Sequence, residues 1–349
     1  MPEARAYTIG ADGLSDWVSA LLGRAQVVAP RALHGSDVAY DVVESPAQVA
    51  WSYTTSLSPL KRQLFPQTDT LFCWHRQPGD GLELMPLYDE VERIFLGVRP
   101  CDVSAALLLD SVFGRDQADV YYLSRRRNSA MVALACTQPA EHCFCVCAHA
   151  GPFLDGGYDL QLTPLGDSYL AEVGSGKGAG LVEQAPGLFA PAPPTAVDAR
   201  RELAQQAEQR FRDDRAYFAA ALRKVTFDRV PEALWDQMAD RCLNCGACAF
   251  VCPTCTCFTT ADFDSSGDGV RCRLWDSCLY ESYALEASGH NPRAEGKHRL
   301  KARFFHKLSY QFARKLGAHG CVGCGRCITA CLGRNDMTKV TARIRTGEL

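Results

Sequence analysis

The sequence predicts an α+β protein, with a mixed α/β N-terminal part followed by a helical, cysteine-rich C-terminal part. In the first part, short apolar runs such as Gln26–Ala29 and Met131–Ala135 alternate with helical patterns such as Ala105–Phe113. The second part combines helical periodicity with closely stepped cysteines. At 349 residues, of which 47% are hydrophobic, the chain is long enough to bury the cores of more than one domain.

The N-terminal domain is expected to span residues 1–190 and to contain a β-hairpin. Residues 158–173 read YDLQLTPLGDSYLAEV, in which two alternating runs lie on either side of Pro164–Gly166. The GSGKGAG run that follows, residues 174–180, satisfies neither GxGxxG nor GxxxxGK[ST]. We therefore interpret that run as a flexible turn and not as a nucleotide site.

A linker and a charged helix, residues 191–230, are expected to precede a C-terminal domain of residues 231–349. The PAPP run Pro191–Pro194 predicts the linker, and apolar positions along Val197–Lys224 predict the helix. Near the C-terminus, apolar residues recur every four positions from Leu300 to Leu316 among many basic ones, which predicts a single amphipathic helix. Its basic face is expected to be solvated, although it could also dock an acidic partner.

Composition excludes several partners. The formal net charge of −3 provides no global field that would attract nucleic acid or an anionic membrane, so neither is expected. The N-terminus has no apolar core of the signal-peptide kind, and no run approaches the ~18 apolar residues that cross a bilayer. The expectation is a soluble, unexported, cytoplasmic protein.

The 18 cysteines are far more than an ordinary chain carries, and most fall into three groups, within residues 101–147, 242–278 and 321–331. In an unexported chain, glutathione and thioredoxin disfavour structural disulfides. Metal ligation is therefore the expected use, because a polynuclear cofactor requires several thiolates close together.

Two runs carry the strongest signal: CLNCGACAFVCP, from Cys242 to Pro253, and CVGCGRCITACL, from Cys321 to Leu332. In the bacterial CxxCxxCxxxCP pattern, the first three thiolates bind one [4Fe–4S] cubane and the fourth binds the other. This pattern predicts a ferredoxin-like domain with two [4Fe–4S] clusters. The first cluster is assigned to Cys242, Cys245, Cys248 and Cys331, and the second to Cys321, Cys324, Cys327 and Cys252.

One alternative and two departures accompany this assignment. Paired CxxC steps also bind structural zinc, but two evenly stepped four-cysteine runs fit cubanes better. Leu332 occupies the position where ferredoxins commonly have proline, and residues 253–320 form a long insert between the runs. The insert holds Cys255, Cys257, Cys272 and Cys278, which are either further ligands or small buried hydrophobes, and the second interpretation is favoured.

A third iron–sulfur cluster is expected in the N-terminal domain. Its ligands would be Cys101 in GVRPCD, Cys136 after the apolar run MVALA, and Cys143 and Cys145 in CFC. Asp102 could supply an oxygen ligand instead, and unmetallated core cysteines are the alternative. No HExxH or GxSxG element is present, so no catalytic residue is assigned.

Several motifs together resemble one family. They are GVRPCD (97–102), CFC (143–145), GYDLQLTPLGDSYLAEVGS (157–175), CPTCTCF (252–258), WDSC (275–278), EASGHNPR (286–293) and CVGCGRC (321–327). These runs resemble the beta subunit of the soluble sulfhydrogenases, which are cytoplasmic NAD(P)-linked [NiFe] hydrogenases. The A subunit of anaerobic sulfite reductase is similar, and the beta subunit of the deazaflavin-reducing hydrogenases is more distantly so. The matches extend from about residue 55 to residue 331.

The resemblance implies a non-catalytic electron-transfer subunit of an oxidoreductase complex. Its partners would be a flavin- and NAD(P)-binding gamma subunit and the small and large subunits of the hydrogenase. The corresponding subunit of a sulfite or sulfur reductase is the alternative, and an enzyme with its own flavin is a third possibility. The resemblance also favours the N-terminal cluster, whereas Cys147 and Cys272 stay outside every assignment.

Overall fold

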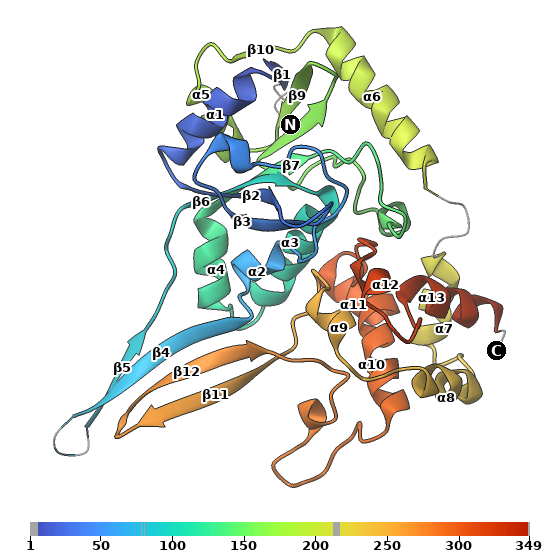
Figure 1. Ribbon diagram of the computed structural model, residues 1–349. Helices are drawn as coiled ribbons and strands as arrows, with labels where there is room; N and C mark the ends of the chain where they lie inside the picture. Colours follow the sequence, from blue (N-terminus) through green and yellow to red (C-terminus); the bar gives the residue numbers. More distant parts are fainter. Residues whose placement is uncertain (1–5, 78, 80, 212–216, 348–349) are drawn as a thin grey trace.

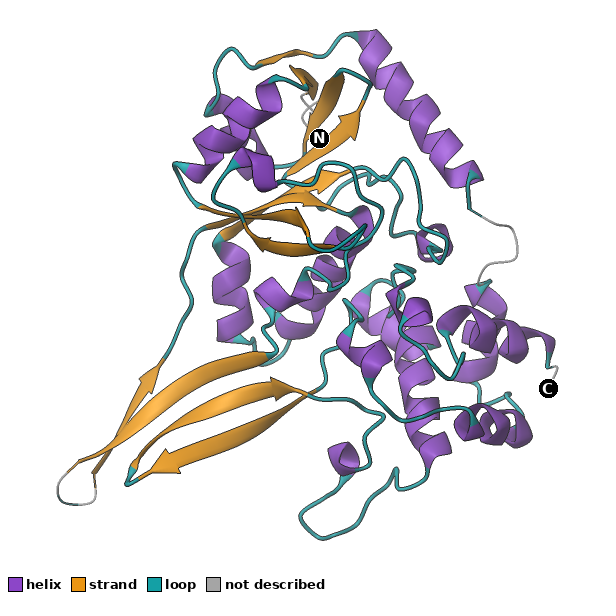
Figure 2. Ribbon diagram, viewed as in Figure 1, coloured by secondary structure: helices purple, strands orange, loops and turns teal. Residues whose placement is uncertain are grey.

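The computed structural model describes residues 6–77, 79, 81–211 and 217–347. Figures 1 and 2 show a large sheet flanked by helices, a smaller sheet that projects as an arm, and a C-terminal group of helices. The mixed α/β character predicted from the sequence is thus confirmed, and the cysteine-rich runs lie within the helical group.

The larger sheet is parallel at its centre and antiparallel at its edges. Its order is β10-β1-β9-β8-β7-β6-β2-β3, and β2, β6, β7 and β8 are parallel neighbours. The strands are β1 (Ala6–Gly10), β2 (Gln26–Ala32), β3 (Val38–Val42), β6 (Arg93–Val98), β7 (Ser129–Leu134), β8 (Leu160–Pro164), β9 (Ser168–Val173) and β10 (Phe189–Pro191). Every residue of β7 is buried, as expected for a parallel strand covered on both faces.

Alternate residues of the central strands pack into two separate hydrophobic cores. Ile94 and Leu96 of β6 pack into the core that contains Trp17, whereas Phe95 packs into the core that contains Phe65. This alternation follows from the two-residue period of a strand. The helices of this part are α1 (Gly13–Leu22), α2 (Lys61–Leu64), α3 (Pro100–Phe113), α4 (Val120–Arg127), α5 (Gly176–Glu183) and α6 (Pro194–Gln209).

The predicted β-hairpin is confirmed as β8 and β9, which pair antiparallel. The flexible turn expected at residues 174–180 is wrong, because Gly176 begins α5. The hydroxyl of Ser175 accepts the backbone N–H groups of Lys177 and Gly178, which caps the helix. A Cβ at Gly178 would collide with the carbonyl oxygen of Asp159, so this glycine allows the helix to approach the sheet closely.

Two predicted helices are each divided into two. In place of one helix over Val197–Lys224, α6 ends at Gln209 and α7 (Phe218–Thr226) follows, while residues 212–216 of that prediction lie outside the described residues. The basic helix divides into α10 (Gly296–Leu308) and α11 (Tyr310–Leu316). Ser309 between them is extended, and its hydroxyl accepts from the N–H of Phe312 at 3.3 Å, which starts the second helix.

The C-terminal helices share a core built from Phe218, Leu222, Trp235, Phe304 and Val340. The remaining helices here are α8 (Glu232–Asp240), α9 (Ala247–Phe250), α12 (Arg326–Thr329) and α13 (Met337–Thr346), and the short 3₁₀ helices of the chain are η1 (Pro46–Gln48), η2 (Cys145–Ala148) and η3 (Ser282–Ala284). Helices α9 and α12 follow equivalent steps of the two cysteine runs and contact each other.

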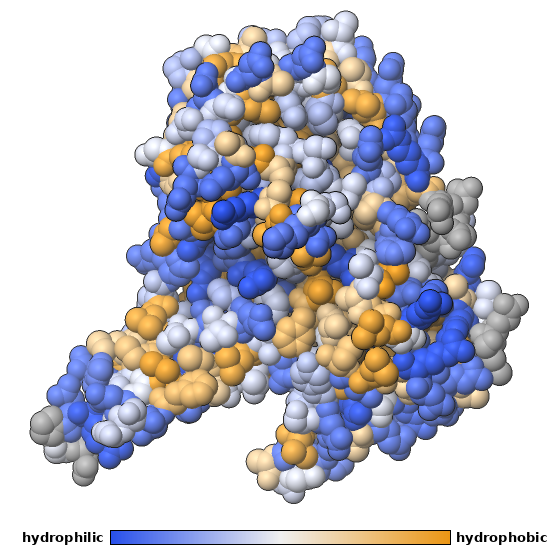
Figure 3. All heavy atoms as spheres, viewed as in Figure 1, coloured by the Kyte–Doolittle hydropathy of each residue, from blue (hydrophilic) through white to orange (hydrophobic). Residues whose placement is uncertain are grey.

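The insert between the cysteine runs forms half of the smaller sheet. Its strands β11 (Phe258–Ser265) and β12 (Asp268–Trp275) form a hairpin, and β12 pairs antiparallel with β4 (Thr68–Gln77), which pairs with β5 (Gly81–Pro86). This sheet forms the arm in Figure 1. Figure 3 shows apolar side chains along the arm, and Leu82, Leu84 and Phe263 are among the exposed ones. The long insert is therefore ordered by pairing with a hairpin from the N-terminal half.

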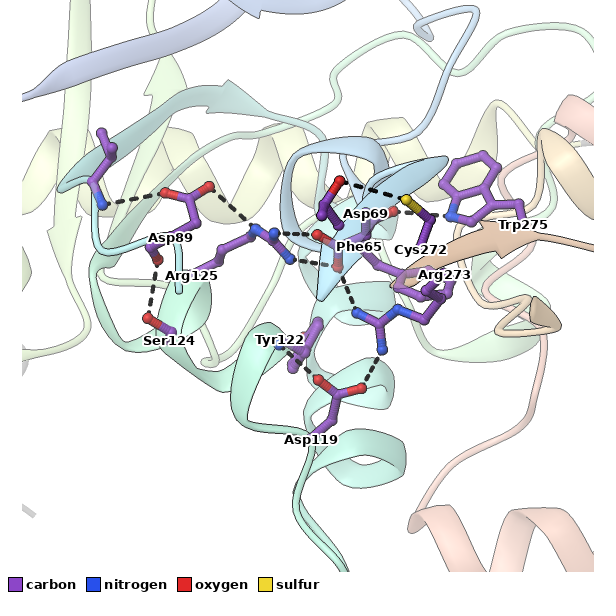
Figure 4. Close-up of polar contacts among 12 residues, drawn as sticks. Phe65, Asp69, Asp89, Asp119, Tyr122, Ser124, Arg125, Cys272, Arg273 and Trp275 are labelled. Carbon is purple, nitrogen blue, oxygen red and sulfur yellow. Dashed lines mark hydrogen bonds and ion pairs between the residues drawn. The ribbon is translucent and has the colours of Figure 1, made fainter. Parts of the chain in front are cut away.

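A buried ion network fixes the base of the arm (Figure 4). Asp69 accepts hydrogen bonds from Arg125 at 2.5 and 3.0 Å and from Arg273 at 2.8 Å. Arg273 also pairs with Asp119, and its guanidinium lies over the ring of Phe65 at 4.7 Å. The charges are mutually satisfied and almost fully buried, so removing one partner leaves an uncompensated charge in the interior.

We expect Arg273→Leu to destabilise the protein by about 3–5 kcal/mol, because Asp69 and Asp119 lose a buried partner. The matched control is Arg271→Leu on the same strand, whose ion pair with Asp262 is exposed and contributes less than about 1 kcal/mol. Denaturant unfolding of the two variants measures the difference. Equal losses of stability would show that the buried network does not hold the arm.

Candidate metal centres

The first cysteine-lined cavity combines one run with the end of the other. Cys242, Cys245 and Cys248 line it together with Cys331, which follows α12. The backbone N–H of Asn335 donates to the sulfur of Cys331 at 3.2 Å, which fixes the position of that sulfur at the cavity.

The second cavity has the reciprocal composition. Cys321, Cys324 and Cys327 line it together with Cys252, which follows α9 in the other run. The N–H of Gly323 donates to the sulfur of Cys321 at 3.5 Å. Within the described ranges, no three His, Cys, Asp or Glu side chains are close enough to share a single metal ion. A cubane does not require such convergence, because each thiolate binds its own iron.

Equivalent glycines shape the two runs. Gly246 and Gly325 both have positive φ, of 70° and 78°, immediately before α9 and α12. Each lets the chain turn from the two first cysteines into a short helix that carries the third, Cys248 or Cys327. A side chain at either position would also meet a close neighbour, the hydroxyl of Tyr280 at 2.6 Å or the carbonyl of His142 at 2.5 Å.

Helix α10 directs two buried cations at the cavities. Arg303 lines both cavities, and Lys307 lines the second. Each is 4% exposed, and neither has a carboxylate within 4 Å among the described residues. Burial lowers the pKa of Lys307, but the negative charge of Cys252 and Cys255 outweighs burial and raises it. The expectation of a solvated basic face is therefore wrong, because sulfur ligands supply the counter-charge that makes burial possible.

The thiols of the second cavity are deeply buried. Burial raises the pKa of Cys321 to about 12, and it also raises the pKa of Cys324 and Cys327. The free thiols of these three residues therefore favour the protonated form, whereas contact with Cys255 lowers the pKa of Cys252. Binding of a metal cluster would displace these protons, which makes loading of the site favourable at higher pH.

The four N-terminal cysteines also come together. Cys101 lies in the first turn of α3, Cys136 follows β7, and Cys143 and Cys145 lie at η2, so all are near the carboxyl ends of β6 and β7. Burial, together with the negative charge of Cys136, raises the pKa of Cys143 to about 11. Burial also raises the pKa of Cys145, and the negative charge of Cys143 and Cys136 raises it further. Burial raises the pKa of Cys101 as well, with a smaller contribution from the charge of Cys145.

This N-terminal group lies directly against the second cavity. The N–H of Phe144 donates to the carbonyl of Gly323 at 2.8 Å, and the thiol of Cys143 donates to the carbonyl of Cys324 at 3.8 Å. Sequence analysis could not predict this contact, because Cys143 and Cys324 are 181 positions apart. The result is a continuous series of thiols from the first cavity through the second to the N-terminal group.

A buried ion pair that sequence analysis missed joins the same two regions. Arg326, inside the CVGCGRC run, donates to Asp102 at 3.0 and 2.6 Å, and Tyr40 donates to the same carboxylate at 3.1 Å. Asp102 is 1% exposed. Its oxygens are engaged by these donors, so the alternative of Asp102 as a metal ligand is not favoured. The signal available in the sequence was a pair of opposite charges inside two cysteine motifs, Asp102 in GVRPCD and Arg326 in CVGCGRC.

The insert cysteines divide into two kinds. Cys272 is buried on β12, where it contacts the hydroxyl of Thr70 at 3.6 Å. Cys255, Cys257 and Cys278 instead line a third cavity, together with Tyr283. Sequence analysis treated all four alike as small hydrophobes, an interpretation that fits the environment of Cys272.

The comparisons with known proteins agree with this geometry. Residues 241–334 match a family described as a 4Fe-4S dicluster domain, and residues 206–255 match a second family of that description. These matches identify 4Fe-4S dicluster domains in the C-terminal part of the chain. The chain is also 28% identical over 315 residues to sulfhydrogenase 2 subunit beta of Pyrococcus furiosus, covering 90% of this chain and 91% of that relative. The resemblance drawn from the motifs is thereby confirmed.

No helix in the described part of the chain is both long enough and apolar enough to cross a bilayer. The relative matched over most of its length is by name a subunit of a larger enzyme. The location of this chain and the identity of its partners are considered below as proposals.

We expect Arg303→Leu to lower the reduction potentials of the clusters in both cavities, because the lost cation stabilises the more negative, reduced state. Arg299→Leu is the matched control: Arg299 is buried one turn earlier on α10, but its guanidinium bonds to the carbonyl of Arg293 at 3.0 Å. An EPR-monitored redox titration compares the two. Unchanged potentials in the Arg303 variant would contradict the electrostatic role.

Proposed function

We propose that this chain is an electron-transfer subunit of a cytoplasmic NAD(P)-linked [NiFe] hydrogenase. It would relay electrons between a flavin- and NAD(P)-binding subunit and the hydrogenase small subunit, which serves the large subunit. The observation that carries the proposal is the unbroken series of cysteine groups, in which the two dicluster cavities share Arg303 and the N-terminal group contacts the second. The 90% coverage by a sulfhydrogenase beta subunit supports the terminal enzyme.

The ligand assignment is part of the proposal. Cys242, Cys245, Cys248 and Cys331 would hold one [4Fe–4S] cluster, and Cys321, Cys324, Cys327 and Cys252 the other. The shared lining of the two cavities supports this crossed arrangement, which is typical of two-cluster ferredoxins. When bound, each cluster accepts and releases single electrons. The protein supplies the thiolates, excludes water from the second cavity and balances charge through Arg303 and Lys307.

A third cluster held by Cys101, Cys136, Cys143 and Cys145 would extend the series into the α/β part. Mutual proximity of these thiols and their contact with the Cys324 segment support it. The domain limits of residues 1–190, 191–230 and 231–349 also remain a proposal. The pairing of β4 with β12 ties the first and last of these segments together.

The equivalent subunit of an anaerobic sulfite or sulfur reductase is the second candidate. The same series of clusters would serve that enzyme, since ligand type alone fixes neither the reduction potential of a cluster nor its electron acceptor. Purification of the tagged chain with its native partners distinguishes the two, because a co-purifying nickel protein indicates a hydrogenase and a sirohaem protein indicates a sulfite reductase.

The crossed assignment makes a sharp prediction. Cys252→Ala should damage the cluster of Cys321, Cys324 and Cys327, and Cys331→Ala should damage the other, because each removes the thiolate that the opposite run contributes. The double variant Cys252→Ala/Cys324→Ala should keep one EPR signal intact, since both changes affect a single site. Loss of both signals in the double variant, while each single variant loses a different one, would exclude crossing.

The N-terminal cluster predicts a measurable iron difference. Relative to the wild type, Cys143→Ser/Cys145→Ser should lose about four irons per chain with matching acid-labile sulfide, since two thiolates no longer suffice for a cubane. Cys73→Ser is the control, because its thiol donates to the carbonyl of Met85 on the arm, at 3.7 Å. If both variants retain wild-type iron, the N-terminal group consists of unmetallated thiols.

For the subunit role, we expect the iron-loaded chain alone to neither oxidise hydrogen nor reduce NAD(P), because the sequence has no dinucleotide motif. Once combined with its flavin-containing partner, the same chain should become reducible by NAD(P)H, seen as bleaching of the cluster absorbance. Hydrogenase or NAD(P)-reducing activity in the chain alone, or a flavin released from it by acid, would overturn the proposal.

A further inference from the structure

A third cysteine-lined cavity lies at the base of the insert hairpin. Cys257 immediately precedes β11 and Cys278 follows β12, so the pairing of Phe258 with Trp275 brings the two thiols to the same end of the hairpin. The N–H of Asp276 donates to the carbonyl of Cys257 at 3.0 Å, which closes this end. The hairpin register therefore holds together two cysteines that are 21 residues apart in the sequence.

Cys255 completes the group from the CPTC turn that leaves the first run. Its N–H donates to the carbonyl of Cys252 at 3.5 Å, and its sulfur faces Arg303 Nη1 at 3.8 Å. Lys61, from α2 of the α/β part, donates to the carbonyl of Cys255 at 3.0 Å and lies over the ring of Trp275 at 3.7 Å. The thiols are thus enclosed by elements from both halves of the chain.

The charge around these thiols points to a bound anion. Lys61, Arg303 and Lys307 are each 4% exposed, and within the described residues none of them has a carboxylate partner within 4 Å. Buried cations without a counter-charge are strongly destabilising. Arg303 and Lys307 line both this cavity and the second dicluster cavity. Lys61 lines none of the three cavities, but its ammonium donates to the carbonyl of Cys255 beside this one.

We propose that Cys255, Cys257 and Cys278 are thiolate ligands of a further iron–sulfur cluster, distinct from the two dicluster sites and from the N-terminal group. The inference stands on the cavity and its buried cations, and it does not depend on which terminal enzyme the chain serves. The hydroxyl of Tyr283, which also lines the cavity, would supply an oxygen ligand to an iron that has no cysteine ligand.

Other fillings of the cavity explain less. A disulfide between Cys257 and Cys278 is neutral and would leave Lys61 without a counter-charge. A structural zinc ion requires four donors converging on one point, whereas among the described residues no three His, Cys, Asp or Glu side chains converge in that way. An iron–sulfur cluster carries net negative charge and needs no three thiolates at one iron, which meets both conditions.

The position of this cluster would place it on the same wall as the second dicluster site. Cys255 adjoins Cys252, and Arg303 and Lys307 line both cavities. The series of clusters would therefore branch at the second site, with one branch toward the N-terminal group and one toward the hairpin that carries the arm.

The test compares the full-length chain, prepared anaerobically, with its Cys255→Ser/Cys257→Ser/Cys278→Ser variant. We expect the variant to lose about two to four irons and as many acid-labile sulfides per chain, while the EPR signals of the two dicluster sites persist. The control is Cys272→Ser, a buried cysteine of the same hairpin whose thiol faces Thr70, and it should retain wild-type iron.

Unchanged iron and sulfide in the triple variant would overturn the proposal, as would the loss of zinc in place of iron. If the triple variant does not accumulate, Cys257→Ala/Cys278→Ala carries the same test, because the one remaining thiolate, that of Cys255, cannot hold a cluster; wild-type iron in that chain is equally decisive against the cluster. These outcomes are independent of the partner experiment, which can fail with the iron difference intact.

Discussion

The guanidinium of Arg303 lies where three cysteine-lined cavities meet, and much of the C-terminal architecture depends on its burial. A buried arginine without a carboxylate is tolerated only where other negative charge surrounds it. Here the charge comes from sulfur: Cys248, Cys255 and Cys327 all raise the pKa of Arg303 against the effect of burial. Helix α10 can therefore run through the centre of the domain with charged residues on its inner face.

Three ties hold the α/β part against this centre. The Asp102–Arg326 pair joins the GVRPCD segment to the second cysteine run, and the Asp69–Arg273 pair joins β4 to the insert. Strands β4 and β12 add a ladder of backbone hydrogen bonds. All three connect residues at least 195 positions apart in the sequence. Such rigid attachment suits electron transfer, which requires fixed distances between centres.

Sequence analysis succeeded where the determining interactions are local. The stepped cysteines and the glycines beside them specify a tight turn into a short helix, so the grouping of Cys242 with Cys245 and Cys248 could be read directly from the spacing. The β8–β9 hairpin was equally visible, because both its alternation and its turn residues are contiguous.

It failed where a residue's environment comes from distant segments. The basic residues of α10 look like a solvent-exposed face in the sequence, and only the thiols brought by residues 248–257 and 321–327 explain why Arg303 and Lys307 are buried. Likewise, helix Gly176–Glu183 packs against the sheet because Gly178 lets it approach the carbonyl of Asp159, 19 positions earlier, and that contact has no local signature.

The two dicluster cavities differ in their access to solvent, and the difference bears on the direction of the proposed relay. Around the first cavity, Cys245 is exposed, and Leu243 and Leu332 are 64% and 81% exposed. The second cavity is closed by Phe144 and by Lys307. A partner subunit can approach the first cavity across this apolar rim, whereas Cys321 and Cys324 of the second cavity are buried. Leu332, which departs from the proline of ferredoxins, thus lies where an electron would enter or leave the chain.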